Sequence, residues 1–176
     1  MKTFTSVIIS VAAFVGFGYV AADNAVGDEL LGQWYTADNA SKVEIVKRDG
    51  KYFGTIIWLS EPNYEAGDAE AGKPKRDREN PETSRKNDPV IGIQVLKNFH
   101  YVADEKTWEG GTIYDPENGR TYKCVIRFQD DPQATDGKSL HVRGYIGIPT
   151  LGRTTVWYRV PKDDMEETEQ TRQASE

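Results

Sequence analysis

Few residues of this sequence are of the types that perform catalysis, and they form no complete catalytic or metal-binding pattern. His100 and His141 are its only histidines, and no serine stands in the glycine-flanked turn that holds a hydrolase nucleophile. Asp115 and Glu117 match part of a calcium-binding loop but lack its other oxygen ligands, so a simple turn is the better interpretation. Zinc-ligand spacings of His or Cys are absent. We therefore expect no enzyme activity, no catalytic residues, no metal site and no cofactor.

The single cysteine, Cys124, lies in a run of alternating residues. Tyr122, Cys124, Ile126 and Phe128 share one face, and the residues between them share the other. The apolar face is expected to be the core face. A cysteine there behaves as a small buried hydrophobe, whereas a reactive thiol would need exposure and a lowered pKa. We therefore predict a structural role for Cys124.

Aromatic residues are the side chains best suited to bind a small ligand. The chain has 4 Trp, 9 Tyr and 6 Phe, and ligand cavities are lined by aromatic side chains with a few polar groups that orient the ligand. Aromatic residues in strands also form ordinary cores, so both interpretations stay open. The candidate ligand-binding residues are Trp34, Trp58, Tyr114, Arg143, Tyr145 and Trp157. Arg143 stands opposite an apolar face and is either solvent-facing or a buried anchor for an anion.

The elements that would position these residues are strands, because apolar and polar residues alternate along most of the chain. Asp49 and Gly50 stand between two such runs, which is a strong signal for a β-hairpin. No helical span separates the runs, so a parallel sheet alternating with helices is not expected. Antiparallel strands that must protect their edges form a closed barrel or a sandwich. The predicted strands cover residues 32–36, 42–45, 51–59, 90–98, 107–114, 121–128, 139–147 and 153–160.

The last predicted turn is rich in glycine. Gly147 and Gly152 bracket Ile148, Pro149, Thr150 and Leu151. Glycines at such places allow a bend at a barrel corner. Leu151 in this turn is either a buried plug or an exposed interaction tip. The simpler structural interpretation is that the turn forms a corner of the barrel.

The overall composition limits the classes of protein. The chain has 176 residues, with 28 acidic and 22 basic side chains and a formal net charge of −6. This length favours one domain, and a hydrophobic content of 38% is enough for a core, which excludes wholesale disorder. The negative charge argues against a nucleic-acid-binding protein, which normally carries a basic surface. A single cysteine excludes an internal disulfide framework.

The N-terminal residues have the layout of a secretory signal peptide. Lys2 is the only charge before Asp23, residues 7–20 form an apolar run, and small residues precede Asp23 where a signal peptidase would read them. We expect cleavage near Ala22, export to the periplasm or secretion, and no membrane span in the mature chain. An uncleaved anchor is the alternative, because the uncharged stretch is just long enough to cross a bilayer.

After the signal peptide (1–22), residues 23–161 are expected to form a single domain. Residues 61–89 interrupt its strands with a long polar segment that is rich in proline and charge. A loop of this length is either functional or a solvated, partly disordered excursion. The acidic tail at 162–176 is expected to be disordered.

Several stretches of the chain resemble the bacterial exported family catalogued as domain of unknown function 2147. The matching stretches are 32–34 (GQW), 49–54 (DGKYFG), 91–92 (IG), 108–119 (WEGGTIYDPENG), 142–147 (VRGYIG) and 151–157 (LGRTTVW). The resemblance implies an all-β fold, an antiparallel up-and-down, lipocalin-like β-barrel of about eight strands. It also implies that Trp34 of the first strand packs against Arg159 of the last, as in lipocalins.

Two functions remain open at this point. The first is an exported (periplasmic) protein, not an enzyme, that binds a small apolar or amphipathic ligand in its barrel. The alternative is a protein-interaction module, such as an inhibitor or envelope-stress factor, whose barrel is filled by side chains. It would contact an envelope protein partner through residues 61–89 and 147–153. A cavity of a few hundred cubic ångströms would favour the first function.

Overall fold

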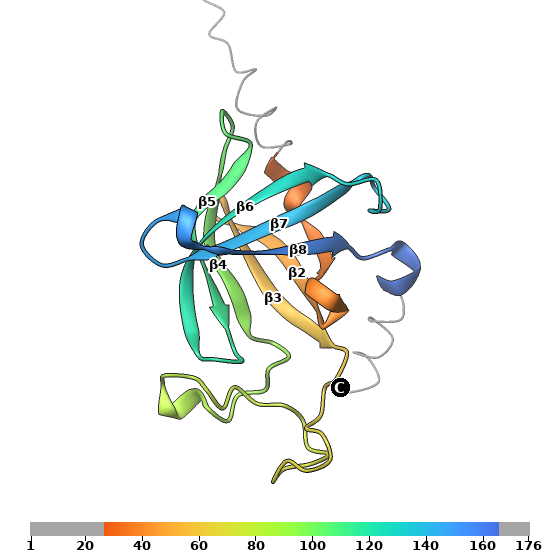
Figure 1. Ribbon diagram of the computed structural model, residues 1–176, viewed down its shortest axis with the longest axis vertical. Helices are drawn as coiled ribbons and strands as arrows, with labels where there is room; N and C mark the ends of the chain where they lie inside the picture. Colours follow the sequence, from red (N-terminus) through yellow and green to blue (C-terminus); the bar gives the residue numbers. More distant parts are fainter. Residues whose placement is uncertain (1–26, 166–176) are drawn as a thin grey trace, which may run out of the picture.

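The computed structural model describes residues 27–165 and shows a closed antiparallel barrel (Figure 1). Each strand is hydrogen-bonded to the next in the chain, and β1 pairs with β8 to close the barrel. The strands are β1 (Gly32–Tyr35), β2 (Ser41–Arg48), β3 (Lys51–Leu59), β4 (Gln94–Val102), β5 (Thr107–Asp115), β6 (Arg120–Asp130), β7 (Lys138–Tyr145) and β8 (Arg153–Arg159). The predicted up-and-down barrel is therefore confirmed. The expected signal peptide lies outside the described residues.

The connections of this barrel alternate between its two ends. The open end is formed by the β1–β2, β3–β4, β5–β6 and β7–β8 connections, at residues 36–40, 60–93, 116–119 and 146–152. The closed end is formed by the remaining connections, at 49–50, 103–106 and 131–137, together with residues 27–31. In Figure 1 the β3–β4 connection lies below the strands, and the β7–β8 connection projects at the left.

Short 3₁₀ turns add to these connections. They are η1 (Asp28–Leu30), η2 (Ala37–Asn39), η3 (Thr83–Arg85) and η4 (Pro149–Leu151). At the β2–β3 connection, Asp49 and Gly50 have φ of 50° and 72°, as a two-residue type I′ hairpin turn requires. The predicted hairpin is thus confirmed. Within residues 27–165, no helix is long and apolar enough to cross a membrane.

Five aromatic residues fill the closed end, and we call them the aromatic base. They are Trp34, Tyr52, Tyr101, Trp108 and Phe128. The ring centre of Trp108 lies 5.1 Å from that of Tyr101 and 5.4 Å from that of Phe128, which is the usual range for aromatic pairs. The indole N–H of Trp108 donates to the carbonyl of Gly27 at 3.0 Å. The base is therefore both apolar and hydrogen-bonded.

Trp34 and Arg159 meet where the barrel closes. They are register partners in β1 and β8, and the guanidinium carbon of Arg159 lies 4.1 Å from the centre of the Trp34 ring system. The same guanidinium donates to the carbonyls of Glu29 and Leu31 at 2.7 and 3.0 Å. Arg159 thereby ties the N-terminal residues to the last strand, and the Trp–Arg contact expected from the resemblance is confirmed.

The boundaries of several strands differ from those predicted, as at β2, which covers Ser41–Arg48 and not 42–45. The strand predicted to begin at residue 90 begins at Gln94, because Gly92 adopts a φ of 103° and residues 90–93 form a turn. This turn still bonds to β3, since the N–H of Ile56 donates to the carbonyl of Ile93 at 2.9 Å. The strand predicted to run to residue 147 ends at Tyr145.

Cys124 lies on the inner face of β6 and is 1% exposed. Burial raises the pKa of its thiol to about 12, so the thiol stays protonated and unreactive at neutral pH. The predicted structural role of Cys124 is confirmed.

Candidate functional site: the barrel cavity

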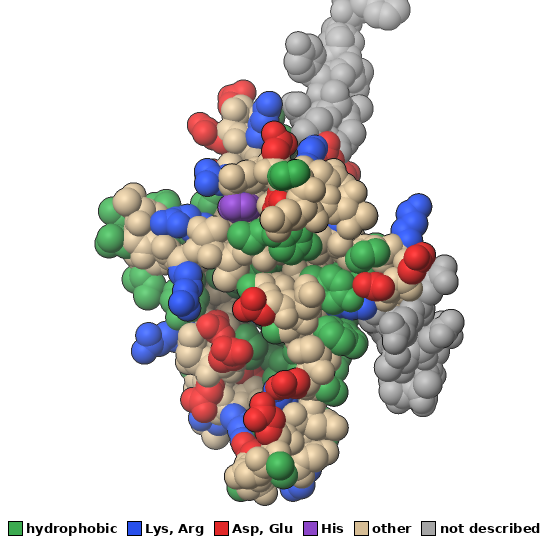
Figure 2. Space-filling view, turned by 45° about the vertical axis from the view of Figure 1, so that its right-hand side comes forward, with side chains coloured by type: hydrophobic (Ala, Val, Ile, Leu, Met, Phe, Trp, Pro, Cys, Tyr) green, Lys and Arg blue, Asp and Glu red, His purple; other side chains and the backbone are tan. Residues whose placement is uncertain are grey.

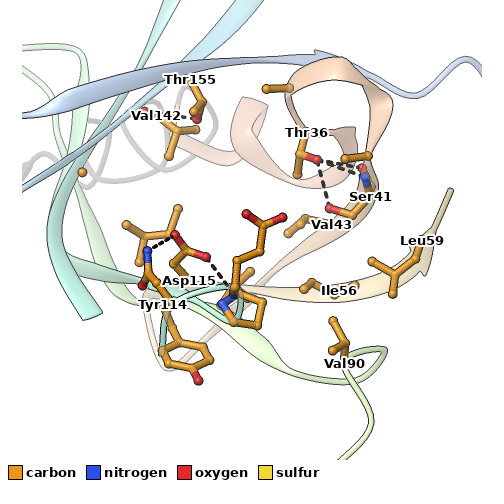
Figure 3. Close-up of a pocket in the computed structure, with 18 of the residues that line it drawn as sticks. Thr36, Ser41, Val43, Ile56, Leu59, Val90, Tyr114, Asp115, Val142 and Thr155 are labelled. Carbon is orange, nitrogen blue, oxygen red and sulfur yellow. Dashed lines mark hydrogen bonds between the residues drawn. The ribbon is translucent and has the colours of Figure 1, made fainter. Parts of the chain in front are cut away.

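A cavity of about 1200 Å³ lies in the open half of the barrel. Its walls are inward-facing aliphatic side chains from several strands, with one tryptophan. They are Val43, Ile56, Val95, Ile113, Val142 and Trp157. Figure 3 shows Val43, Ile56 and Val142 facing this space from β2, β3 and β7. The volume is above the usual range of small-molecule sites, about 300–1000 Å³.

Three hydroxyl groups in the cavity wall, those of Thr36, Ser41 and Thr155, are already hydrogen-bonded within the protein. Thr36 and Ser41 bond to each other through their side-chain oxygens at 2.9 Å. The hydroxyl of Thr155 accepts from the indole N–H of Trp157 at 3.1 Å and donates to the carbonyl of Val142 at 3.4 Å. Because these polar groups have partners, the interior presents mainly apolar surface to an occupant.

Charged side chains surround the mouth of the cavity. The cations are Lys75, Arg76, Arg78 and Arg153, and the carboxylates are Asp38, Glu61, Glu79, Asp115 and Glu117. An occupant that reaches the mouth therefore meets polar groups, whereas one held deeper meets aliphatic carbon. This arrangement suits an amphipathic molecule or a purely apolar one.

The β3–β4 connection forms one wall of this cavity. Asp77, in its middle, is fully buried and accepts hydrogen bonds of 2.6 Å from the hydroxyl of Tyr114 and from the side-chain amide of Asn80. Burial, and then the Asp77 carboxylate, raise the pKa of the Tyr114 phenol. The Tyr114 hydroxyl therefore stays protonated and keeps donating to Asp77.

A second contact fixes the same segment to the β5–β6 turn. Gly119 has a φ of 69°, and a Cβ placed on it would overlap the backbone carbonyl of Glu79. Only glycine fits this approach. Together with the Asp77–Tyr114 bond, the contact holds residues 77–80 against the barrel rim, so the segment is a structured wall and not a solvated excursion.

An ion cluster braces the outer part of the wall. The guanidinium of Arg78 binds Asp68 through two hydrogen bonds, of 2.7 and 2.9 Å, and Glu70 through one of 2.7 Å. It also lies over the ring of Tyr64 at 3.4 Å. Hydrogen bonds from Arg78 lower the pKa of Asp68 to about 2. The positive charge of Arg78 is thus neutralised by two carboxylates, although Arg78 borders the cavity.

Three of the six predicted ligand-binding residues line the cavity. Tyr114, Tyr145 and Trp157 border it from β5, β7 and β8. Trp34 does not, because it is fully buried in the aromatic base at the other end. The structure therefore brings together only the candidates from the open half of the barrel.

Trp58 and Arg143 also lie away from the cavity. A register irregularity between Lys42 and Val43 pairs Trp58 with Lys42, and the Trp58 ring packs beside Tyr35 with ring centres 6.2 Å apart. Arg143 donates to the carbonyls of the β7–β8 connection, so it supports that loop from the outer face of β7. The interpretation of Arg143 as a buried anion anchor is not supported.

Selection by aromatic character missed most of the cavity wall. Val43, Ile56 and Val142 are core residues by alternation alone, and the sequence marks them as inward-facing without showing that one side borders a void. Tyr64 and Val90 join the wall from the β3–β4 connection. Their positions depend on long-range contacts of that connection, for which the local pattern carries no signal.

Among the titratable residues considered for catalysis, Asp115 has a role in a turn. Asp115 accepts from the backbone N–H of Glu117 at 2.9 Å and from the side-chain amide of Asn118 at 2.7 Å, which is the turn role that was expected. His141 lies on the side of β7 opposite Leu140 and Val142, and burial and nearby Arg127 lower its pKa. Across residues 27–165, no group of three or more His, Cys, Asp or Glu residues is placed to hold a metal ion.

Comparisons with known proteins agree with this fold. Among solved structures, the chain is similar to protein HP1028 from the human pathogen Helicobacter pylori, which is described as belonging to the lipocalin family. The identity is 23%, the TM-score is 0.62, and the match covers 80% of this chain and 88% of the other. At this identity the likeness concerns the fold alone. No curated protein sequence matches the chain.

A family model matches residues 32–159, a range that runs from β1 to β8 and so includes every strand of the barrel and the cavity wall. The family is described as "Uncharacterized protein conserved in bacteria". The chain therefore belongs to the DUF2147 family, and its barrel is lipocalin-like.

Proposed function

We propose that this protein binds a small apolar or amphipathic molecule inside its barrel, without transforming it. The observation that carries the proposal is the cavity of about 1200 Å³, whose deep walls are aliphatic and three of whose hydroxyl groups are already paired. The inner part of this space loses little by accepting apolar carbon, because the hydroxyl groups of Thr36, Ser41 and Thr155 already have partners within the protein. The lipocalin-like fold of the family is compatible with this use.

The alternative function required a barrel filled by side chains. That condition holds for the aromatic base, whereas the open end carries a pocket whose lining includes aliphatic residues. The cavity therefore favours ligand binding over the filled interaction module.

We further propose that the protein acts in the periplasm, or outside the cell, after removal of residues 1–22. Support comes from the sequence, where a single early charge, an apolar run and small residues before Asp23 follow the pattern of a signal peptide. Expression of the full-length gene and intact-mass analysis of the periplasmic fraction test this. A chain that begins at Asp23 is expected, and an unprocessed cytoplasmic chain would contradict the proposal.

A fluorescent apolar probe tests ligand binding directly. We expect N-phenylnaphthylamine to bind the wild-type protein with enhanced emission. Val142→Phe should abolish the enhancement, because the added ring occupies the cavity. Val46→Phe is the matched control, since Val46 is exposed on β2, and it should bind the probe as the wild type does.

Circular dichroism establishes that each variant is folded. If Val142→Phe fails to fold, Ile113→Phe fills the same space from β5. Probe binding that survives the filling variants would place the probe elsewhere and contradict the proposal.

A further inference from the structure

The β7–β8 connection exposes a group of apolar side chains at the open end, and we call it the apolar tip. Its members are Ile146, Ile148 and Leu151, which are 69%, 58% and 78% exposed. Large apolar residues gathered on one projecting loop are unusual on a monomeric surface and mark an interaction site. The loop projects at the left of Figure 1, and Figure 2 shows hydrophobic side chains at the left edge, beside Lys and Arg side chains.

The tip is held in shape, so its exposure is a fixed feature. The Arg143 guanidinium donates to the carbonyls of Pro149 and Thr150 at 2.7 and 3.1 Å, and to the hydroxyl of Thr154 at 2.8 Å. Backbone bonds within the loop satisfy further polar groups, as when the N–H of Leu151 donates to the carbonyl of Ile148 at 3.2 Å. A loop with internally bonded backbone can enter a weakly hydrated layer at low cost.

The tip and its two flanking strands contain no acidic residue and several basic ones, although the net charge of the chain is negative. No acidic residue occurs between Asp136 and Asp163, whereas Arg143 and Arg153 flank the tip. Among residues 27–165, no carboxylate forms an ion pair with either arginine. The whole chain carries a formal charge of −6, so this loop is a cationic site on an acidic protein.

From these observations we propose that the apolar tip docks on an anionic lipid surface, with its three apolar side chains inserted at the headgroup boundary. One convex loop with three such residues is too small for a stable protein interface, which needs about 800 Å² on each partner. Shallow insertion combined with basic residues is how peripheral proteins hold anionic membranes. Ile146, Leu151 and Arg153 also border the cavity, so docking would bring its mouth to the membrane.

Vesicle co-sedimentation tests the proposal, with protein expressed from the full-length gene and its N-terminus defined by intact mass. The vesicles are phosphatidylethanolamine with phosphatidylglycerol, compared with phosphatidylcholine alone. We expect the wild type to bind the anionic vesicles. The combined variant Ile146→Ser, Ile148→Ser and Leu151→Ser should bind at least about tenfold more weakly. The exposed Val46→Ser is the apolar control and should bind like the wild type.

A charge variant separates the two contributions. Arg153→Gln should weaken binding to the anionic vesicles by about fivefold, since one basic residue near such a surface contributes about that factor, and should leave phosphatidylcholine binding unchanged. Lys51→Gln, at the closed end, is the matched control and should have no effect.

Three results would overturn the proposal. The first is a wild type that does not bind anionic vesicles, and the second is a tip variant that binds them equally well. The third is a wild type that sediments as a dimer beside a monomeric tip variant, because the tip would then be a contact between two copies. None of these results bears on probe binding in the cavity, so the proposed ligand function stands or fails separately.

Discussion

The two ends of this barrel are built from the same alternating strands but differ in what their inward side chains do. At the closed end, large aromatic rings contact one another, and the indole N–H groups of Trp34 and Trp108 donate to carbonyls within residues 27–31. At the open end, valine, isoleucine and threonine line the inner part of a pocket of about 1200 Å³, which reaches outward to the rim loops. The size of the inward side chains therefore differs between the end that is filled by aromatic rings and the end that holds the pocket.

The largest expected effect is at the closed end. Trp108→Ala should lower the free energy of unfolding by about 3–5 kcal/mol, because a fully packed aromatic side chain is removed and a cavity remains. Urea unfolding at equilibrium measures this. Trp157→Ala should cost less, since the Trp157 ring already borders a void. Equal losses at both ends would contradict the difference in packing.

Substitutions in the wall of the cavity should lower the stability of the protein more than substitutions at its exposed rim. Tyr114→Phe leaves the buried Asp77 carboxylate with one fewer donor, and we expect a loss of about 1.5–3 kcal/mol. Hydrogen exchange should become faster in residues 75–90. The control is Tyr122→Phe, which removes only an exposed bond of 3.3 Å to Asn118. A Tyr114→Phe protein with unchanged exchange would show that the wall is held by other contacts.

The contacts that close the barrel between β1 and β8 should contribute less to the free energy of unfolding. Arg159→Met keeps the aliphatic part of the side chain but removes the stacking on Trp34, two hydrogen bonds to the N-terminal residues and the ion pair with Asp136. We expect a loss of about 1–2 kcal/mol, measured by thermal unfolding. A variant as stable as the wild type would mean that the aromatic base closes the barrel unaided.

The smallest effect concerns the ion cluster on the outer wall. Arg78→Gln should raise the pKa of Asp68 from about 2 towards 3.8, as followed by carboxyl-carbon NMR. Arg76→Gln, on the same segment, should leave it unchanged. Since the folded pKa is lowered, the stabilising effect of the pair is present above pH 3.8 and is lost as the pH falls towards 2. An Asp68 that titrates near 3.8 in the wild type would contradict the cluster.

Local patterns in the sequence predicted antiparallel strands in a barrel or a sandwich, and the resemblance to the family selected the barrel. The alternation around Cys124 predicted its inner face, and Asp49 and Gly50 predicted the hairpin. The Trp34–Arg159 contact followed from the resemblance. Each of these predictions concerns residues close in sequence or a contact shared with a known fold.

The cavity and its wall could not be predicted in the same way. Whether a barrel is hollow depends on the summed volume of inward side chains from all strands, and alternation does not report volume. The order of residues 60–93 depends on contacts such as Asp77 with Tyr114 and Glu79 with Gly119, which join segments far apart in the chain. Aromatic character was therefore a poor guide, as Trp34 and Trp58 illustrate.

Native mass spectrometry tests the central claim, that the open half is a container, most directly. Wild-type protein and Val142→Phe would be expressed from the full-length gene, purified without denaturant and compared after addition of N-phenylnaphthylamine. The account predicts one bound probe molecule on the wild type and none on Val142→Phe, with Val46→Phe behaving as the wild type. A wild type that binds no probe, or a filled variant that binds it equally, would contradict the account.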